Sequence, residues 1–256
     1  MQPPLQLRRN GAPVPGFLGV CSQTEAEQLG QALETVLGPA ELAHFRQLQF
    51  PLRRGSYLLG RIALKRALAA LLAEPRLERL EILSGVFGQP LVRAAAPVAA
   101  EISLAHSHGV ALGAACAAGH PIGIDLELIE PTRVDVFTRV FSQEEFALLA
   151  AAGVPQPSAG FVLWTVKEAL SKALRCGLTV PFAVLRAKSV VPGSAGPPGV
   201  QWQVEFENFW QYKAHAWIVG AYALAVVIPR KTDLGFQPDG ALRALLEAGP
   251  GRRATG

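Results

Sequence analysis

The sequence predicts an α+β fold built from two lobes that meet near residue 119. Helical patterns come first along the chain, a strand-rich middle follows, and helices and then strands appear again in the second half. Of the 256 residues, 50% are hydrophobic, which is enough for a large buried core. We expect an amino-terminal lobe over 1–118, a carboxy-terminal lobe over 119–229 and a flexible polar tail over 230–256.

The first part of the chain is expected to form two helices and a strand. Residues 24–37 have helical periodicity, with Thr24 as the N-cap residue and Glu27 completing a capping box. A second helix is predicted over 55–73, before a proline that would end it. The run over 78–84 is typical of a strand.

Turn residues separate three strand-like runs in the middle of the chain. The runs cover 101–105, 110–118 and 121–129, and the connections between them contain Gly109 and Gly119. Short connections of this kind favour pairing between neighbouring strands, so we predict an antiparallel meander.

The second half of the chain returns to helical periodicity. Ser142 followed by Glu145 is typical of a capped helix start, and Gly177 is expected to end the longest helix in a left-handed conformation. The predicted segments are, in order, a helix over 142–152, a loop over 151–160, a helix over 161–175, and strands over 200–206 and 217–228.

Composition excludes several classes of protein. The three cysteines, Cys21, Cys116 and Cys176, lack the spacing of a disulfide framework or a zinc site, which favours a reducing, cytoplasmic location. The start of the chain does not resemble a signal peptide. The apolar stretch 216–229 is too short to cross a bilayer, so we expect no membrane partner.

The net charge of +4 is unevenly distributed. No acid lies between Glu41 and Glu74, whereas six basic residues do: Arg46, Arg53, Arg54, Arg61, Lys65 and Arg66. This surplus favours either a polyanion-binding surface or an ordinary solvated helix face. Aromatic and basic residues do not alternate as in nucleic-acid-binding proteins, so no nucleic-acid partner is expected.

Two carboxylates share one face of a predicted strand. In the segment GIDLE, at 123–127, Asp125 and Glu127 are two residues apart, so they project from the same side about 6.5–7 Å apart. Their repulsion would be relieved by a divalent cation, and Mg²⁺ commonly uses one or two carboxylates together with substrate phosphates. The alternative is a half-exposed strand whose acids face water.

A second charged pair lies on the longest predicted helix. In WTVKEALSK, at 164–172, Glu168 and Lys172 are one turn apart on one face. They form either a surface ion pair or part of an active site, in which Glu168 is a third metal ligand or a base and Lys172 neutralises phosphate oxygens. Lys167 points away from this face and is interpreted as structural.

Together the two segments resemble the signature of the 4′-phosphopantetheinyl transferase superfamily, a G-I/V-D-x-E strand followed by F/W-x-x-K-E-S/A-x-x-K on a helix. Residues 103–107 (SLAHS) and 88–90 (GQP) are similar to two further family segments, N-I/V-S-H-S and G-K-P. Here Ser103, Ala105 and Gln89 replace the usual Asn, Ser and Lys. The chain length is similar to that of the surfactin-synthetase-activating type, which implies a pseudo-dimer of two similar α+β lobes with the active site in the cleft between them.

The resemblance implies Mg²⁺-dependent transfer of 4′-phosphopantetheine from coenzyme A to a serine of an apo acyl or peptidyl carrier protein, releasing 3′,5′-ADP. It also implies a monomeric, cytoplasmic enzyme. By motif position the metal ligands would be Asp125, Glu127 and Glu168, and the catalytic residues Glu168 and Lys172. The coenzyme A contacts would be Arg46, Arg53, Phe87, Gly88, Gln89, His106, Asp125 and Lys172. A metal-dependent phosphodiester hydrolase and a non-catalytic coenzyme A-binding module are the alternatives.

Overall fold

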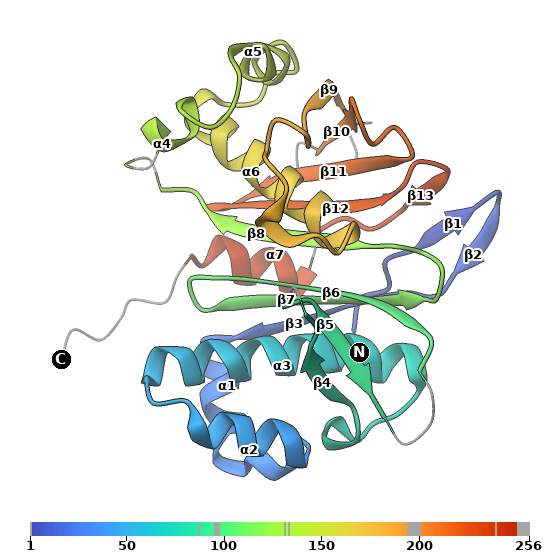
Figure 1. The fold of residues 1–256 in the computed structure, drawn as a ribbon, viewed down its shortest axis with the longest axis vertical. Coiled ribbons are helices and arrows are strands. Elements are labelled where there is room, and N and C mark those ends of the chain that lie inside the picture. Colours follow the sequence, from blue (N-terminus) through green and yellow to red (C-terminus); the bar gives the residue numbers. More distant parts are fainter. Residues whose placement is uncertain are drawn as a thin grey trace.

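The predicted α+β class is confirmed by the computed structural model, in which two mixed lobes are stacked along the long axis (Figure 1). The structure describes residues 2–86, 88–94, 98–130, 132, 134–193, 201–238 and 240–249. The predicted division near residue 119 falls in the turn between strands β7 and β8. Among the described residues no single helix is long and apolar enough to cross a bilayer; helices α5 and α6 pass that test only as a pair, bent by 112°.

The amino-terminal lobe packs helix α3 against an antiparallel sheet of order β3-β7-β6. A two-stranded ladder, β4-β5, continues beside β6. The elements are β3 (Gly16–Ser22), α1 (Gln23–Leu29), α2 (Pro39–Gln47), α3 (Pro51–Leu72), β4 (Glu81–Ser84), β5 (Pro90–Arg93), β6 (Ala100–Ser107) and β7 (Val110–Ala117), with 3₁₀ turns over Gly30–Thr35 and Leu77–Arg79.

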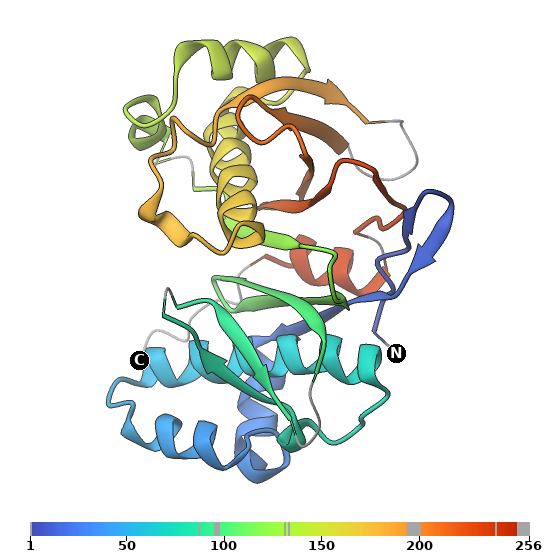
Figure 2. The ribbon, with the colours of Figure 1, turned by 45° about the vertical axis from the view of Figure 1, so that its right-hand side comes forward.

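The carboxy-terminal lobe has the same plan, with helix α6 against a sheet of order β8-β12-β11-β10-β9. Figure 2 shows α3 and α6 lying along their respective sheets. The elements are β8 (Gly123–Leu128), α4 (Val134–Thr138), α5 (Gln143–Ala151), α6 (Gln156–Ala173), a 3₁₀ turn over Gly177–Thr179, β9 (Ala187–Pro192), β10 (Gln201–Phe206), β11 (Tyr212–Val219) and β12 (Tyr222–Pro229).

The strand orders show that the two lobes are similar. Each begins with a strand (β3 or β8), continues through helices to a long helix (α3 or α6), and returns through four strands. In both lobes the first strand pairs with the last, which pairs with the strand before it. The pseudo-dimer implied by the family resemblance is therefore present in the chain topology.

A buried ion pair also recurs in the two lobes. Glu41 in the first turn of α2 pairs with Lys65 of α3, and Glu145 in the first turn of α5 pairs with Lys167 of α6, with Nζ 2.7 Å from Oε1. Each glutamate also accepts a hydrogen bond from the backbone N–H of a strand that follows the long helix. Because both charges of each pair are buried, they lock the short helix to the long one. Lys167 is thus structural, as predicted.

The two sheets face each other across a shared apolar core. This core includes Leu112 of β7, Leu126 of β8 and Leu224 of β12, and it is completed by Leu242 and Leu246 of helix α7 (Gly240–Glu247). A small sheet of order β13-β1-β2 joins the two ends of the described chain; its strands are β1 (Leu7–Arg9), β2 (Ala12–Val14) and β13 (Thr232–Leu234). The lobes are therefore halves of one packed unit.

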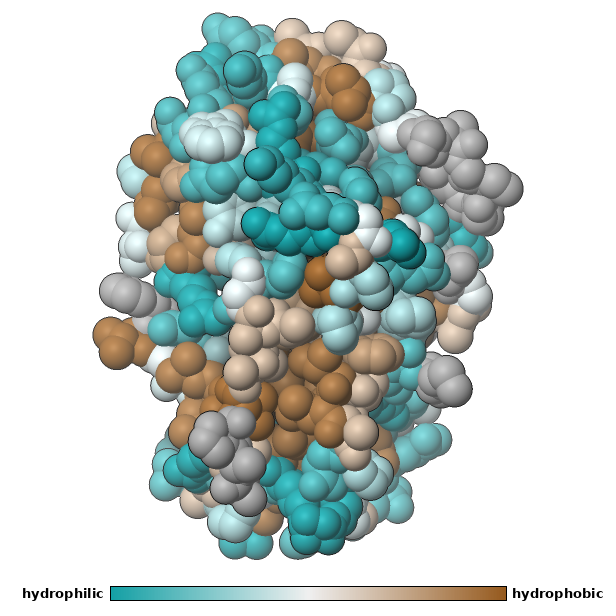
Figure 3. Space-filling view, turned by 90° about the vertical axis from the view of Figure 1, so that its right-hand side faces the viewer, coloured by the Kyte–Doolittle hydropathy of each residue, from teal (hydrophilic) through white to brown (hydrophobic). Residues whose placement is uncertain are grey.

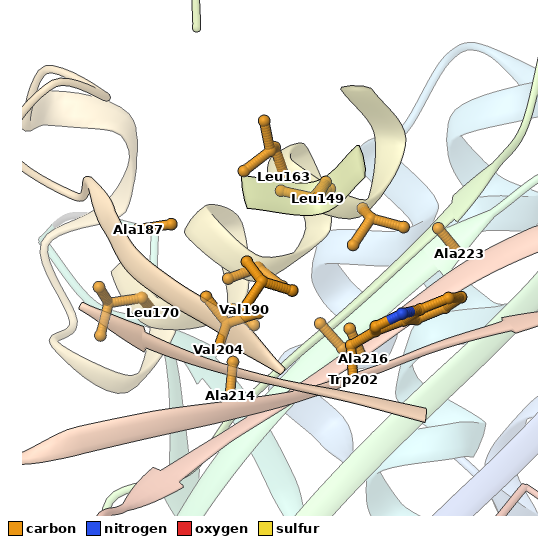
Figure 4. Close-up of a cluster of buried hydrophobic side chains, with 14 of the residues drawn as sticks. Leu149, Leu163, Leu170, Ala187, Val190, Trp202, Val204, Ala214, Ala216 and Ala223 are labelled. Atoms are coloured by element: carbon orange, nitrogen blue, oxygen red, sulfur yellow. The ribbon is translucent and has the colours of Figure 1, made fainter. Parts of the chain in front are cut away.

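A second core lies between α6 and the other face of its sheet. Trp202 and Val204 of β10 and the alanines Ala214, Ala216 and Ala223 line the sheet side (Figure 4). Small side chains on the strands let the helix lie close to the sheet.

The surface in Figure 3 is mainly hydrophilic over the upper, carboxy-terminal lobe, while hydrophobic residues gather over the lower one.

Several predicted segment boundaries are wrong. The helix predicted over 24–37 ends at Leu29 and continues as a 3₁₀ turn, the helix predicted over 55–73 begins at Pro51, and the strand predicted over 217–228 is the end of β11, a turn and β12. The first helix begins after Ser22, not Thr24, because the Ser22 hydroxyl accepts the Glu25 N–H and the Glu25 carboxylate accepts the Ser22 N–H. Helix α6 begins at Gln156 inside the predicted loop 151–160, because a proline is compatible with the first turn of a helix.

The predicted three-stranded meander and the flexible tail also need correction. β6 and β7 form a hairpin, but β8 pairs with β12 in the other lobe, because its apolar face packs in the core between the sheets. Within the predicted tail 230–256, β13 pairs with β1, and α7 buries Leu242 and Leu246. Residues 250–256 lie outside the described residues.

Gly123 should be essential to the contact between β8 and α6. A Cβ atom there would lie 1.8 Å from the backbone oxygen of Ala169, so the helix would have to move. We expect Gly123→Ala to lower the free energy of unfolding by about 3 kcal/mol, the upper end of the usual cost of overpacking, because backbone atoms must move. Urea unfolding measures this loss of stability. The control is Gly55→Ala in α3, where the nearest atom is 3.8 Å away and alanine should stabilise by about 0.5–1 kcal/mol.

His215 should make stability depend on pH. Burial, aided by the nearby Lys213, lowers the pKa of His215 to about 4. Since the unfolded chain binds this proton near pH 6.5, the stabilisation is present at pH 7 and is lost as the pH falls toward 4. We expect about 2 kcal/mol less from this group at pH 5 than at pH 7. His215→Gln should remove that slope in urea unfolding, whereas replacing exposed His44 by Gln should retain it.

Candidate active site between the two lobes

The site lies where the edge strands of the two sheets meet. β6 is the last strand of the amino-terminal sheet and β8 the first of the carboxy-terminal sheet. The Ser103 hydroxyl accepts the Ile124 N–H at 3.0 Å, and the Ser107 hydroxyl accepts the Leu128 N–H at 3.1 Å. Serine side chains of β6 thus satisfy backbone groups of β8 and hold the two edges together. Asp125 and Glu127 lie on this part of β8.

Asp125 is the most buried acid of the site. It is 4% exposed, and Lys172 of α6 pairs with it at 2.6 Å between Nζ and Oδ1. The same ammonium group donates to the Ile124 carbonyl at 3.1 Å. The other carboxylate oxygen, Oδ2, is buried without a hydrogen-bond partner. An unsatisfied carboxylate oxygen beside a cavity is costly, and a bound cation or donor would relieve it.

Glu168 lies one turn before Lys172 and faces the two acids of β8. Burial, and next the negative charge of Asp125, raise the pKa of Glu168 to about 7, with a smaller contribution from Glu127 in the same direction. The structure therefore places Glu168 of α6 at the same cavity as the two acids of β8, about 40 residues earlier in the sequence. The Ser107 hydroxyl donates weakly to Glu127, at 3.5 Å from Oε2.

A cavity of about 400 Å³ opens between the lobes at these residues. Asp125, Glu127, Glu168 and Lys172 line it from the carboxy-terminal lobe. The amino-terminal lobe contributes parts of α3, β4, β6 and the turn before β5. Its lining residues there include Arg61, Ser84, Gly88, Gln89, Pro90 and His106. The lining combines charged side chains with apolar ones such as Leu83 and Leu104.

His106 and the 88–90 turn line the cavity, and their contacts with coenzyme A remain a prediction. Burial of the His106 ring, and next the positive charge of Lys172, lower the pKa of His106. Gly88 and Gln89 line the same space. Phe87, which was also predicted to contact coenzyme A, lies outside the described residues.

The arginines of the basic stretch are distributed differently from expectation. The described cavity lining does not include Arg46 or Arg53, whose coenzyme contacts remain a prediction. Arg61 lines the cavity instead, paired with Glu41 at 3.2 Å and stacked over the ring of Tyr57. Helical spacing alone could not have identified Arg61, because it does not show which face of α3 lines the cavity. Arg175, which also lines the cavity, was missed.

The donors at this site suit a hard cation. All three are carboxylates, and Asp125 keeps a buried oxygen that lacks a partner. Among the described residues, however, no three acid, His or Cys side chains are close enough to hold one ion together. Lys172 pairs with one oxygen of Asp125, so its ammonium group neutralises part of the charge at the site. The residue types fit a magnesium ion that shares its ligands with a substrate phosphate, rather than an ion enclosed by protein alone.

Comparison with known proteins agrees with this site. The family model described as the 4′-phosphopantetheinyl transferase superfamily matches residues 121–227, which carry β8 and α6. A 4′-phosphopantetheinyl transferase, gsp, of Aneurinibacillus migulanus is 29% identical over 126 residues, 49% of this chain and 50% of that protein. The 4′-phosphopantetheinyl transferase psf-1 of Bacillus pumilus is 30% identical over 139 residues, 54% of this chain and 58% of that protein.

The match over residues 121–227 agrees with the resemblance to the 4′-phosphopantetheinyl transferase superfamily drawn from the two motifs. The chain spans about half the length of the curated relatives it matches. Among solved structures, a holo-(acyl-carrier-protein) synthase from Bacillus anthracis in complex with CoA (3′,5′-ADP) is 18% identical, covers 41% of this chain and 96% of that chain, and gives a TM-score of 0.37. A TM-score this low leaves the overall likeness weak.

The serine contacts between β6 and β8 should stabilise the protein. Ser103→Ala leaves the buried Ile124 N–H without its acceptor, so we expect the free energy of unfolding to fall by about 1–3 kcal/mol. Replacing exposed Ser84 by Ala, in the same cavity wall, should change it by less than about 0.5 kcal/mol. Urea unfolding compares the two variants, and an equal, small effect of both would show that the hydroxyl does not hold β8.

Proposed function

We propose that this protein transfers the 4′-phosphopantetheinyl group of coenzyme A to a serine hydroxyl of an apo carrier protein and releases 3′,5′-ADP. The observation that supports this most strongly is the meeting of two family motifs at one cavity. Asp125 and Glu127 of β8 face Glu168 and Lys172 of α6, inside the region matched by the family model. The proposed reaction forms a bond from the serine oxygen to phosphorus and breaks the diphosphate P–O bond.

Charge neutralisation is the main task of such a site. Lys172 lines the cavity, and its side chain is 27% exposed. Its ammonium group can therefore contact a substrate phosphate while it remains beside Asp125. His106 and the 88–90 turn line the same cavity and can contact the adenosine end. In this arrangement the reacting diphosphate lies against α6 and the adenosine against the amino-terminal lobe.

Asp125, Glu127 and Glu168 would hold Mg²⁺. When bound, the ion would neutralise charge on the diphosphate and its leaving group. The buried, partnerless oxygen of Asp125 supports a cation here, and so does the pKa of Glu168, which burial and next the charge of Asp125 raise. We therefore expect chelation by EDTA to abolish transfer and added Mg²⁺ to restore it.

Glu168 is also the candidate base. A pKa of about 7 lets its carboxylate accept the proton of the incoming serine hydroxyl near neutral pH. A carboxylate that binds a metal tightly is a poorer base, so Glu168 would either take the proton itself or orient a water that does.

The proposed partner is a carrier protein, a class that is generally acidic around its serine. The net charge of +4 favours encounter with such a surface, mainly through the association rate. We also propose that the chain acts as a monomer, because both walls of the cavity come from one chain. The proposed location is the cytoplasm, because the three cysteines lack the spacing of a disulfide framework.

Intact mass measurement tests the activity. Purified protein, Mg²⁺, coenzyme A and an apo carrier should give a carrier that has gained one phosphopantetheinyl group. A panel of apo acyl and peptidyl carriers would define the partner. Hydrolysis of the diphosphate without modification of any carrier would instead support the alternative, a metal-dependent phosphodiester hydrolase. Binding of coenzyme A without either reaction would support a non-catalytic module.

Two substitutions separate the roles of the acids. Glu168→Gln should lower kcat by about 100-fold or more, because the amide neither accepts a proton nor carries charge, with little change in unfolding. Asp125→Ala should raise the Mg²⁺ concentration needed for activity or eliminate activity. The control is Glu144→Gln on the exposed face of α5, which should retain wild-type turnover. Near-wild-type rates in Glu168→Gln would contradict the assigned role.

A further inference from the structure

Helix α6 ends at a residue that rarely adopts the conformation found there. Arg175 has φ of +56°, in the left-handed region that glycine adopts without steric penalty. Its N–H donates to the Lys172 carbonyl and the Cys176 N–H donates to the Ser171 carbonyl, both at 3.1 Å. These two bonds define a Schellman motif, in which glycine is the usual residue. The helix end predicted at Gly177 is thus made two residues earlier by an arginine.

The side chain of Arg175 explains why an arginine is useful at this position. It lines the cavity one helical turn beyond Lys172, and it is 50% exposed. It also forms an ion pair with Glu101 of β6, which belongs to the other lobe. The arginine therefore stands at the cavity opening, with its charge held there by the opposite wall.

We propose that Arg175 is a phosphate-binding residue that sets the affinity for coenzyme A; the inference rests on the proposed function. The guanidinium group is planar and offers paired N–H donors that match phosphate oxygens. Arg175 would act together with Lys172, which stays beside Asp125 and the Ile124 carbonyl, whereas the Arg61 side chain is only 12% exposed and is held by Glu41 and Tyr57. The Arg175 side chain is half-exposed, and an entering phosphate can take the place of its partner Glu101.

Glu101 keeps the arginine in place when no substrate is bound. Its carboxylate and a substrate phosphate would compete for the same guanidinium donors. An exposed ion pair is weak, whereas a phosphate inside the cavity carries more charge and is less solvated. Substrate entry is therefore expected to move Arg175 from Glu101 to the phosphate.

Calorimetric titration of the full chain with coenzyme A and Mg²⁺ tests the proposal. Arg175→Gly should raise the Kd for coenzyme A about 10- to 100-fold. The same variant should leave the thermal midpoint of the free protein unchanged or raise it by about 2–4 °C, because glycine removes the unfavourable backbone conformation. Arg175→Lys, which keeps the charge without the planar group, should have a smaller effect on Kd. The control is Arg186→Gln, outside the cavity lining, which should bind as the wild type does.

The 3′-dephospho form of coenzyme A identifies the phosphate. If Arg175→Gly weakens both ligands equally, the contact is to the diphosphate; if it weakens coenzyme A alone, the contact is to the 3′-phosphate. Glu101→Gln should bind coenzyme A as tightly as wild type or more tightly. Unchanged coenzyme A binding in Arg175→Gly, or weaker binding in Glu101→Gln, would overturn the proposal. If the wild-type chain itself fails to bind coenzyme A, it is the proposed function that fails.

Discussion

The site depends on how closely helix α6 approaches strand β8. Gly123 lets the backbone of the helix, at Ala169, lie where any larger side chain would collide with it. That contact fixes the distance between a strand that carries Asp125 and Glu127 and a helix that carries Glu168 and Lys172. The buried pair of Lys167 and Glu145 holds the same helix from its other side. Without this packing, the charged residues would be ordinary surface groups.

The same contact exists in the other lobe without the acids. A Cβ atom at Gly19 of β3 would lie 2.0 Å from the Ala63 oxygen of α3, so this pair is packed as closely as β8 and α6. Two residues beyond Gly19 the strand carries Cys21, whereas two residues beyond Gly123 it carries Asp125. Burial raises the pKa of Cys21 to about 12, so the thiol stays neutral. One lobe therefore supplies the acids, and the other supplies the opposite wall of the cavity.

Much of this arrangement could be predicted from the sequence because the decisive residues lie in two local patterns. Alternation along β8 places Asp125 and Glu127 on one face, and helical spacing places Glu168 and Lys172 together. The partner of β8 could not be predicted, because its apolar face suits either sheet and the choice depends on packing far along the chain. Helix α7 was missed for a related reason, since Leu242 and Leu246 gain stability only from the core between the sheets. Arg175 was missed because its importance comes from a backbone angle and a partner in the other lobe.

The most direct test of the account is a crystal structure of the protein with coenzyme A and Mn²⁺ in place of Mg²⁺, with the metal located by anomalous scattering. The account predicts one metal peak within ligand distance of the carboxylates of Asp125, Glu127 and Glu168, with the coenzyme diphosphate on its remaining positions. A metal peak elsewhere, or a diphosphate bound outside the cavity between the lobes, would contradict it.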